Sequence, residues 1–257
     1  MALVFKLLSA LFFLITLPAH AADDEQNAID PKAAEIAKKS AEFLASRSAL
    51  SFKWFVSYDE VVEEREKITY LRSGNTLMVR DTGFAMYTER GETLRDYYWD
   101  GATVSVVSPN ENWHASASYE GSFDSLVANV RDKTGAILPL WSMLSKSLPN
   151  DLLINVDSGA YLGTTLIAGR QVHHVVFSEK DEDWQIWVST DEDTPVPIML
   201  IGTEKGRTGW PQYRVYMSDW NLDPEFSEAS FKFVPDENST AITLPLLTDV
   251  TTRSSGD

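Results

Sequence analysis

The chain has 257 residues, with 38 Asp and Glu against 22 Lys and Arg, a net charge of −16 and no cysteine. Binding to nucleic acid or to anionic lipid surfaces without sequence specificity depends on Lys and Arg that neutralise phosphate, so this charge balance disfavours both. Because disulfides are excluded, burial of the plentiful apolar and aromatic side chains must stabilise the fold.

The first 21 residues have the pattern of a cleaved secretory signal. Lys6 precedes an apolar run over residues 7–17, and Ala19-His20-Ala21 provides the small residues that signal peptidase recognises. The alternative is a membrane anchor, but such a run spans only about half of a ~30 Å hydrocarbon core. We therefore expect cleavage after Ala21 and a secreted product that has no stable membrane anchor and no lipid attached through cysteine.

Residues 22–257 are predicted to form a single domain with an ordered core over about 29–243. No internal repeat and no long linker divides them. Asp30 is predicted as the N-cap of a helix from Pro31 to about Ser46, because proline has no N–H to leave unpaired in the first turn. Apolar residues recur along this helix at helical spacing, which predicts one buried face.

From Leu50 the apolar period changes to two, which predicts a half-buried strand. The side chains expected on its buried face are Phe52, Trp54, Val56 and Tyr58. Further strands are predicted over four segments that end in Gly or charged turns, at 67–73, 76–80, 83–89 and 94–99. Asp100-Gly101 predicts a tight hairpin into a strand over 102–108, and the turn at 109–112 precedes another.

Residues 122–148 interrupt the strand pattern. Phe123, Leu126, Val127 and Val130 fall at helical spacing, and the segment 137–148 is apolar nearly all round, so both are predicted as helices that need covering. Strands resume at 159–169, 170–179, 183–190, 198–205 and 212–220, and Phe231 and Phe233 are placed in a last short strand. This order predicts an α+β fold with one antiparallel sheet of about 11 strands and helices on one face.

No motif predicts catalysis, a metal site or a cofactor. His114, His173 and His174 have no ligand partner at a suitable spacing, and adjacent residues of a strand point to opposite faces. Nucleophile motifs and Gly-rich phosphate loops are missing from the sequence. The acidic runs 181–183 and 191–193 lack the alternating ligands of a calcium loop, so we interpret them as solvated hairpin ends.

Several strands carry large side chains on both faces, among them RDYYWD at 95–100 and YRVYM at 213–217. A sheet with one wet face should alternate between apolar and polar residues. Either both faces are covered or apolar surface is left for a ligand; a filled core with aromatic residues outside it would also give this pattern. The residues alone leave these interpretations open.

Four segments resemble a family of predicted periplasmic bacterial proteins of unknown function: 29–52, 97–127, 183–201 and 216–235. Through this family the chain resembles the superfamily of periplasmic lipoprotein carriers and outer-membrane lipoprotein receptors (LolA/LolB-like). The shared features are an N-terminal helix, a hairpin with a DG turn, helices after a short polar stretch and a closing F-x-F-x-P at 231–235.

The resemblance implies a periplasmic protein with an unclosed, strongly curved antiparallel half-barrel. Its concave face would be capped by helices, with residues 122–148 as a lid over an apolar cavity that accepts acyl chains. The carriers use a basic residue near the cavity for transfer. Arg80-Asp81-Thr82 stands where relatives often have a basic pair followed by Pro, so the chain departs from the pattern there.

The first hypothesis is therefore a soluble, monomeric, non-enzymatic periplasmic protein that holds a lipid, a lipoprotein acyl chain or another hydrophobic ligand between sheet and lid. The alternative is an interaction or scaffold protein with a filled cavity, whose acidic surface engages a protein partner; an unrecognised hydrolase is a third hypothesis. The residues predicted to line the cavity are Trp54, Val56, Tyr58, Phe84, Met86, Leu126, Val130, Leu140, Trp141 and Leu144.

Overall fold

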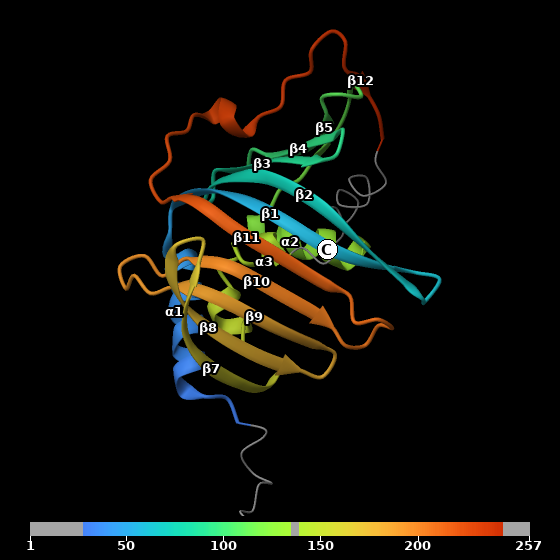
Figure 1. The fold of residues 1–257 in the computed structure, drawn as a ribbon. Coiled ribbons are helices and arrows are strands. Elements are labelled where there is room, and N and C mark those ends of the chain that lie inside the picture. The colour runs from blue at the N-terminus through green and yellow to red at the C-terminus, as the bar shows by residue number, and fades with distance from the viewer. Residues whose placement is uncertain (1–27, 135–138, 244–257) are drawn as a thin grey trace, which may run out of the picture.

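A computed structural model describes residues 28–134 and 139–243; the predicted signal peptide, residues 1–21, lies outside these ranges. One 12-stranded sheet dominates the fold (Figure 1). Its strands are β1 (Ala49–Val62), β2 (Glu66–Val79), β3 (Gly83–Arg90), β4 (Thr93–Trp99), β5 (Thr103–Ser108), β6 (Trp113–Ser118), β7 (Val156–Ile167), β8 (Arg170–Glu179), β9 (Glu182–Ser189), β10 (Pro197–Glu204), β11 (Gln212–Asn221) and β12 (Thr240–Ala241).

The strands follow the order β12-β6-β5-β4-β3-β2-β1-β11-β10-β9-β8-β7, and the sheet is not closed. Every neighbouring pair is antiparallel except β12 with β6, which is parallel. The predicted α+β class, with a single curved and unclosed sheet, is confirmed. The sheet has one strand more than the expected eleven or so, because the short β12 adds to the edge of β6.

The α-helices are α1 (Pro31–Ser46), α2 (Phe123–Thr134), α3 (Pro139–Ser142) and α4 (Leu148–Asp151), and a 3-10 helix, η1, covers Glu228–Phe231. Helix α1 begins as predicted, since the Asp30 carboxylate accepts a hydrogen bond of 2.8 Å from the Lys32 backbone N–H. It packs on β7 to β9, while α2 and α3 lie against the same, concave face of the sheet nearer its other end (Figure 1).

The two strands predicted over 67–73 and 76–80 are one continuous strand, β2, so that prediction was wrong. Gly74 had suggested a turn, but it lies directly opposite Trp54 on β1. A Cβ atom at Gly74 would lie 2.5 Å from the Trp54 ring and 2.1 Å from the Tyr87 carbonyl oxygen. Glycine is therefore needed here for close packing across the sheet and not for a change of direction.

The apolar segment predicted as a helix over 137–148 is also different in the described residues. Helix α3 ends at Ser142, and the chain continues through turns in which Leu144 N donates to Trp141 O and Ser145 N donates to Ser142 O. These bonds join residues three apart and do not continue an α-helix. Leu144 is nevertheless fully buried, so burial of its side chain was predicted correctly although its backbone was not.

The predicted last strand with Phe231 and Phe233 was wrong as well. Phe231 ends η1, and its side chain fills a buried site against Ala49, Val79 and Ala85. Phe233 stacks on Tyr98, with ring centroids 6.2 Å apart. The C-terminal segment, residues 222–243, thus crosses the convex face near β3 to β6 (Figure 1), which explains why strands there carry large side chains on both faces.

Candidate functional site

The concave face of the sheet is built outward from β1, which lies near its middle. Trp54 and Val56 are buried on this face and Tyr58 is half-buried. Directly opposed residues of antiparallel strands point to the same face, so the partners of these three residues face the concave side too. They are Gly74, Arg72 and Tyr70 on β2 and Met217, Val215 and Tyr213 on β11.

Helices α2 and α3 contact this face through aromatic side chains. The Trp141 ring lies edge-on to Phe84, with ring centroids 5.2 Å apart, and edge-on to Tyr97 at 6.0 Å. Its indole N–H donates to the Met86 Sδ atom at 3.4 Å. Phe123, at the start of α2, lies 5.1 Å from Phe84. Together these contacts fix the described part of the lid segment, residues 122–134 and 139–148, on β3 and β4.

The ten residues predicted to line a cavity all come together in one apolar cluster, here called the concave cluster. Tyr58 and Trp141 are half-buried members at its margin, and the other eight are buried. Sequence reasoning did not name several half-buried side chains of the same cluster, because strands such as YRVYM at 213–217 carry large side chains on both faces and their pattern does not show which face is covered. These additional members include Tyr97, Leu200, Tyr213 and Trp220. That the cluster contacts a ligand stays a prediction.

Arg80 joins the lid segment to the rest of the molecule. Its half-buried guanidinium donates to the backbone carbonyls of Leu44 (2.9 Å) and Arg47 (2.8 Å) at the end of α1, and to that of Leu144 (2.8 Å) in the lid segment. Burial lowers the pKa of Arg80, and the charges of Asp124 and Asp81 act against that effect. The guanidinium fork suits this role because it directs several N–H donors at fixed angles.

Lys146 and Asp124 join the two ends of the lid segment to each other, close to the contact with Arg80. The Lys146 ammonium lies 2.8 Å from the Asp81 carboxylate, and both side chains are more than half exposed. The backbone N–H of Lys146 donates to the Asp124 carboxylate at 3.0 Å. An exposed ion pair stabilises a fold by only about 0.2–1 kcal/mol, so Arg80 is the stronger polar tether of the two.

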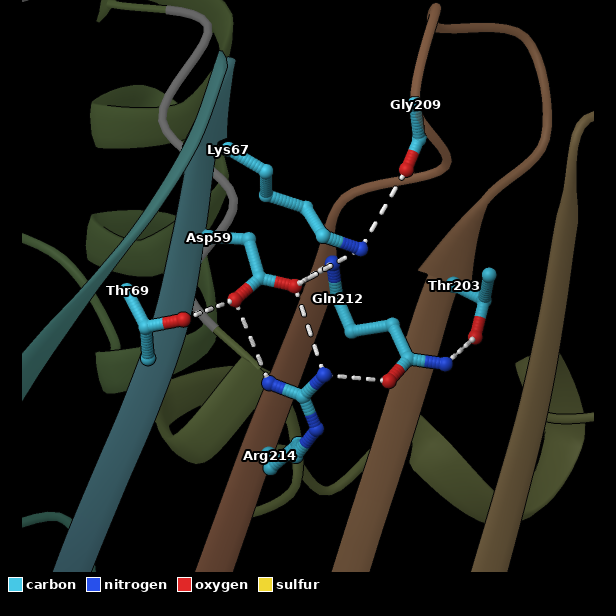
Figure 2. A network of polar contacts seen from close by, with 7 residues as sticks. All are labelled: Asp59, Lys67, Thr69, Thr203, Gly209, Gln212 and Arg214. Atoms are coloured by element: carbon cyan, nitrogen blue, oxygen red, sulfur yellow. Dashed lines mark hydrogen bonds and ion pairs between the residues drawn. The ribbon is translucent and has the colours of Figure 1, made fainter.

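On the convex face, the most connected polar group is Asp59 (Figure 2). Its side chain is 1% exposed. The carboxylate accepts hydrogen bonds from the Thr69 hydroxyl at 2.7 Å, the Gln212 backbone N–H at 3.1 Å and the Arg214 guanidinium at 3.3 Å. The Lys67 ammonium lies 3.7 Å from the same carboxylate. Burial alone would raise the pKa of Asp59, but the hydrogen bonds from Thr69, Arg214 and Gln212 together hold that pKa below its ordinary value.

The Asp59 network has a structural role. It ties together β1, β2 and β11, and Gln212 extends it to Thr203 on β10 through a 3.0 Å hydrogen bond (Figure 2). The period of two along β1 puts Asp59 on the face that points away from Trp54, as in the structure, but it does not predict the burial of Asp59. The residues that accompany its burial are Gln212 and Arg214, which are two residues apart on β11. Only the pairing of β11 with β1 brings them to Asp59, so the sequence alone does not indicate the contact.

The histidines are hydrogen-bonded to neutral groups. His114 pairs with Ser239 (2.7 Å), His173 with Tyr161 (3.0 Å) and His174 with Gln185 (3.0 Å). Burial lowers the pKa of His173. Over residues 28–134 and 139–243, no group of three His, Cys, Asp or Glu side chains is arranged to hold a metal ion.

The two acidic runs behave differently from each other. Residues 191–193 are exposed, as predicted for a solvated hairpin end. In the run 181–183, only Asp181 is exposed, because Asp183 pairs with Lys205 at 2.7 Å and Glu182 is half-buried. Burial, followed by the charges of Glu179, Glu204 and Asp183, raises the pKa of Glu182. The interpretation of residues 181–183 as a solvated hairpin end was therefore only partly correct.

Within the described ranges, no helix has the length and apolar character needed to cross a membrane.

Comparison with solved structures finds similar folds at low sequence identity. Lipoprotein LppX of Mycobacterium tuberculosis is 13% identical, with 76% of this chain and 98% of that chain covered and a TM-score of 0.44. An uncharacterized conserved protein of Thermus thermophilus is 10% identical, with coverages of 82% and 98% and a TM-score of 0.47. A LolA superfamily protein of Nitrosomonas europaea is 10% identical, with coverages of 78% and 97% and a TM-score of 0.37.

A search of curated proteins found no match to the chain. A family model does match, and it covers residues 33–245, from the first turn of α1 to beyond β12. This range includes the whole sheet, both described parts of the lid segment and all ten residues of the predicted site. The chain therefore belongs to the family described as predicted periplasmic protein (DUF2092), as the sequence resemblance had indicated.

Proposed function

We propose that this chain is a soluble, non-enzymatic periplasmic binding protein that holds a lipid, a lipoprotein acyl chain or another hydrophobic ligand between the concave face of the sheet and the lid segment. The observation that carries the proposal is the concave cluster, in which sheet and lid residues meet and several large rings stay partly exposed. The family description supports the periplasmic location, and the signal-like residues 1–21 supply the route.

The partly exposed rings of the concave cluster supply the affinity for a hydrophobic ligand. Tyr58, Tyr97 and Tyr213 on the sheet and Trp141 on the lid segment are only partly removed from water. A hydrocarbon ligand that covered about 200 Å² of apolar area would gain roughly 5 kcal/mol, at about 25 cal/mol per Å². Such a gain depends on area and not on direction, so it suits acyl chains better than ligands that need a fixed pattern of hydrogen bonds.

The lid segment is built in a way that allows it to move relative to the sheet. Its described helices are α2, with 12 residues, and α3, with only four, and after α3 the chain continues in turns whose hydrogen bonds join residues three apart. Arg80 and Asp81 hold the segment through polar contacts, and the concave cluster holds it through apolar packing. A stretch of turns has few backbone hydrogen bonds of its own and opens at lower cost than a long helix does.

Uptake of a fluorescent fatty-acid probe by delipidated protein tests this function. We expect saturable uptake by the wild type and its loss in Trp141→Asp, because a carboxylate is introduced where Phe84, Met86 and Tyr97 meet the ring. Trp210→Asp is the matched control, since it makes the same change at a ring that is 60% exposed in the turn between β10 and β11. Far-UV circular dichroism should be the same for all three proteins.

Mass spectrometry of protein purified from the periplasm provides a second test. We expect a co-purified lipid or fatty acid that is lost from Trp141→Asp. Wild-type protein that carries no lipid and shows no saturable uptake would contradict the proposal. That outcome would favour the scaffold hypothesis, in which binding to a protein partner weakens as salt screens the acidic surface.

A further inference from the structure

A cavity of about 290 Å³ lies on the concave face, toward the end of the sheet where β3 and β4 are joined. It is lined by Arg72, Thr88, Arg90, Thr93, Arg95 and Tyr97. The strand register explains this arrangement, because Arg72 is opposite Val56 on β1, Thr88 is opposite both Gly74 and Arg95, and Arg90 is opposite Thr93. Three arginines from three adjacent strands thus share the face that carries the concave cluster.

The charged residues that line this cavity are all basic, whereas acidic residues outnumber basic ones by 38 to 22 in the whole chain. Among the described residues, neither Arg72 nor Arg90 forms an ion pair or a hydrogen bond through its guanidinium; each lies over a tyrosine ring, Arg72 at 5.6 Å from Tyr58 and Arg90 at 4.7 Å from Tyr70. Within residues 28–134 and 139–243, only Arg95 of the three has a carboxylate partner, Glu111 at 2.7 Å. The other two guanidinium charges therefore have no counter-charge among these residues.

Like charges gathered on one face repel one another, and a bound anion would remove this repulsion. Guanidinium groups bind phosphate and carboxylate through two parallel N–H donors, and aromatic stacking leaves those donors free. The buried Thr88 adds a hydroxyl that makes no hydrogen bond to any described residue.

The cavity lined by Arg72, Arg90 and Arg95, here called the arginine cavity, is continuous with the concave cluster. Tyr97 lines the cavity and also contacts Trp141 of the lid segment, with ring centroids 6.0 Å apart. Tyr58, beneath Arg72, is one of the residues predicted to contact the ligand. A molecule lying along the concave face would therefore meet apolar rings over most of its length and guanidinium groups at one end.

We propose that Arg72, Arg90 and Arg95 bind the phosphate or carboxylate head group of an anionic lipid whose hydrocarbon part lies against the concave cluster. This inference rests on the proposed function and adds the class of its ligand. It also assigns an orientation, with the head group at the turn between β3 and β4 and the acyl chains directed toward Phe84 and Trp141.

Isothermal titration calorimetry with two short-chain lipids tests the head-group assignment. Dihexanoylphosphatidylglycerol and dihexanoylglycerol carry the same acyl chains, and only the first has a phosphate. We expect the wild type to bind the phosphatidylglycerol at least about tenfold more tightly. The double variant Arg72→Gln/Arg90→Gln should lose this preference and keep the wild-type affinity for dihexanoylglycerol. The matched control Arg65→Gln/Arg170→Gln removes two exposed arginines elsewhere and should keep the preference.

The remaining outcomes separate the two proposals. If the wild type binds both lipids equally, the head-group assignment is overturned and the proposed function stands. If it binds neither lipid, the proposed function fails and the ligand class fails with it. Inorganic phosphate alone should bind far more weakly than the phosphatidylglycerol; equal affinity would mean that the arginines form a site for free phosphate, which also overturns the assignment.

Discussion

The concave face is covered by helical segments of two different kinds. Helix α1 is a single helix of 16 residues with a capped start, and it places Ala33, Ile36 and Ala37 against β8 and β9. The lid segment has a 12-residue helix, α2, and one of four residues, α3, and it presents large rings such as Phe123 and Trp141 to β3 and β4. The first cover places small side chains of one long helix on the sheet, and the second places large rings from shorter helices on it.

These two constructions indicate which cover belongs to the permanent core. Alanines let a helix approach a sheet closely, and a 16-residue helix that unfolds when it detaches loses many backbone hydrogen bonds. The four-residue helix and the turns around Trp141 have fewer such bonds to lose, and a ligand can take over the apolar contacts of the ring. We therefore expect changes under α1 to affect stability and changes at the lid segment to affect ligand exchange.

We expect Phe177→Ala, beneath α1, to destabilise the protein most. Phe177 is 2% exposed and stacks on Trp184 with ring centroids 4.2 Å apart. Truncation leaves a cavity, so the free energy of unfolding in urea should fall by about 3–5 kcal/mol. Probe uptake by the folded variant should be unchanged. Phe55→Ala, at a ring that is 45% exposed on the other face, is the control and should have little effect on either measurement.

The second prediction concerns the tether of the lid segment. Arg80→Gln removes three charge-assisted hydrogen bonds to the carbonyls of Leu44, Arg47 and Leu144, so the free energy of unfolding should fall by about 2–3 kcal/mol. Amide hydrogen exchange over residues 139–148 and release of the fatty-acid probe should both become faster. Arg80→Lys keeps the charge without the planar fork and should resemble the glutamine variant. Faster exchange spread evenly over the sheet would show that Arg80 stabilises the whole fold and not the lid segment.

Much of the fold could be predicted because its signals are local. Asp30 and Pro31 mark the start of α1 through the cap they form. Asp100-Gly101 predicted a hairpin, and the structure has Gly101 at φ 89° with the Asp100 carboxylate accepting from the Thr103 N–H at 2.7 Å. Gly74 was misread because the ring that requires it belongs to another strand. Local sequence cannot distinguish a glycine that turns the chain from one that admits a neighbour.

The candidate site likewise has one part that the sequence predicted and one part that it did not. Its apolar part was predicted because period-two spacing on a single strand places Trp54, Val56 and Tyr58 on one face. The arginine cavity was not predicted, because Arg72, Arg90 and Arg95 are far apart in sequence and each alone is an ordinary surface cation. Only the pairing of β2, β3 and β4 brings them together, and that register is a property of the whole sheet.

A substitution at Asp59 tests the sheet that carries both covers, and we expect it to destabilise the protein least. Asp59→Asn leaves α1 and the lid segment untouched but removes the charge that pairs with Arg214 and Lys67 (Figure 2). Near neutral pH the free energy of unfolding should fall by about 1–2 kcal/mol. Because the folded-state pKa of Asp59 lies below the unfolded value of about 3.9, the stability it contributes is complete above that value and is lost as pH falls through the folded pKa.

The difference in unfolding free energy between wild type and Asp59→Asn should therefore be constant from pH 7 down to about 5 and shrink below about 4. Urea unfolding at a series of pH values measures it. A difference that stays constant down to the lowest pH would mean that the carboxylate charge contributes nothing and that the amide only packs less well. Probe release from Asp59→Asn at pH 7 should match release from the wild type, because the Asp59 network lies on the convex face. Faster release would show that the sheet and the lid segment are coupled and that the two covers cannot be treated separately.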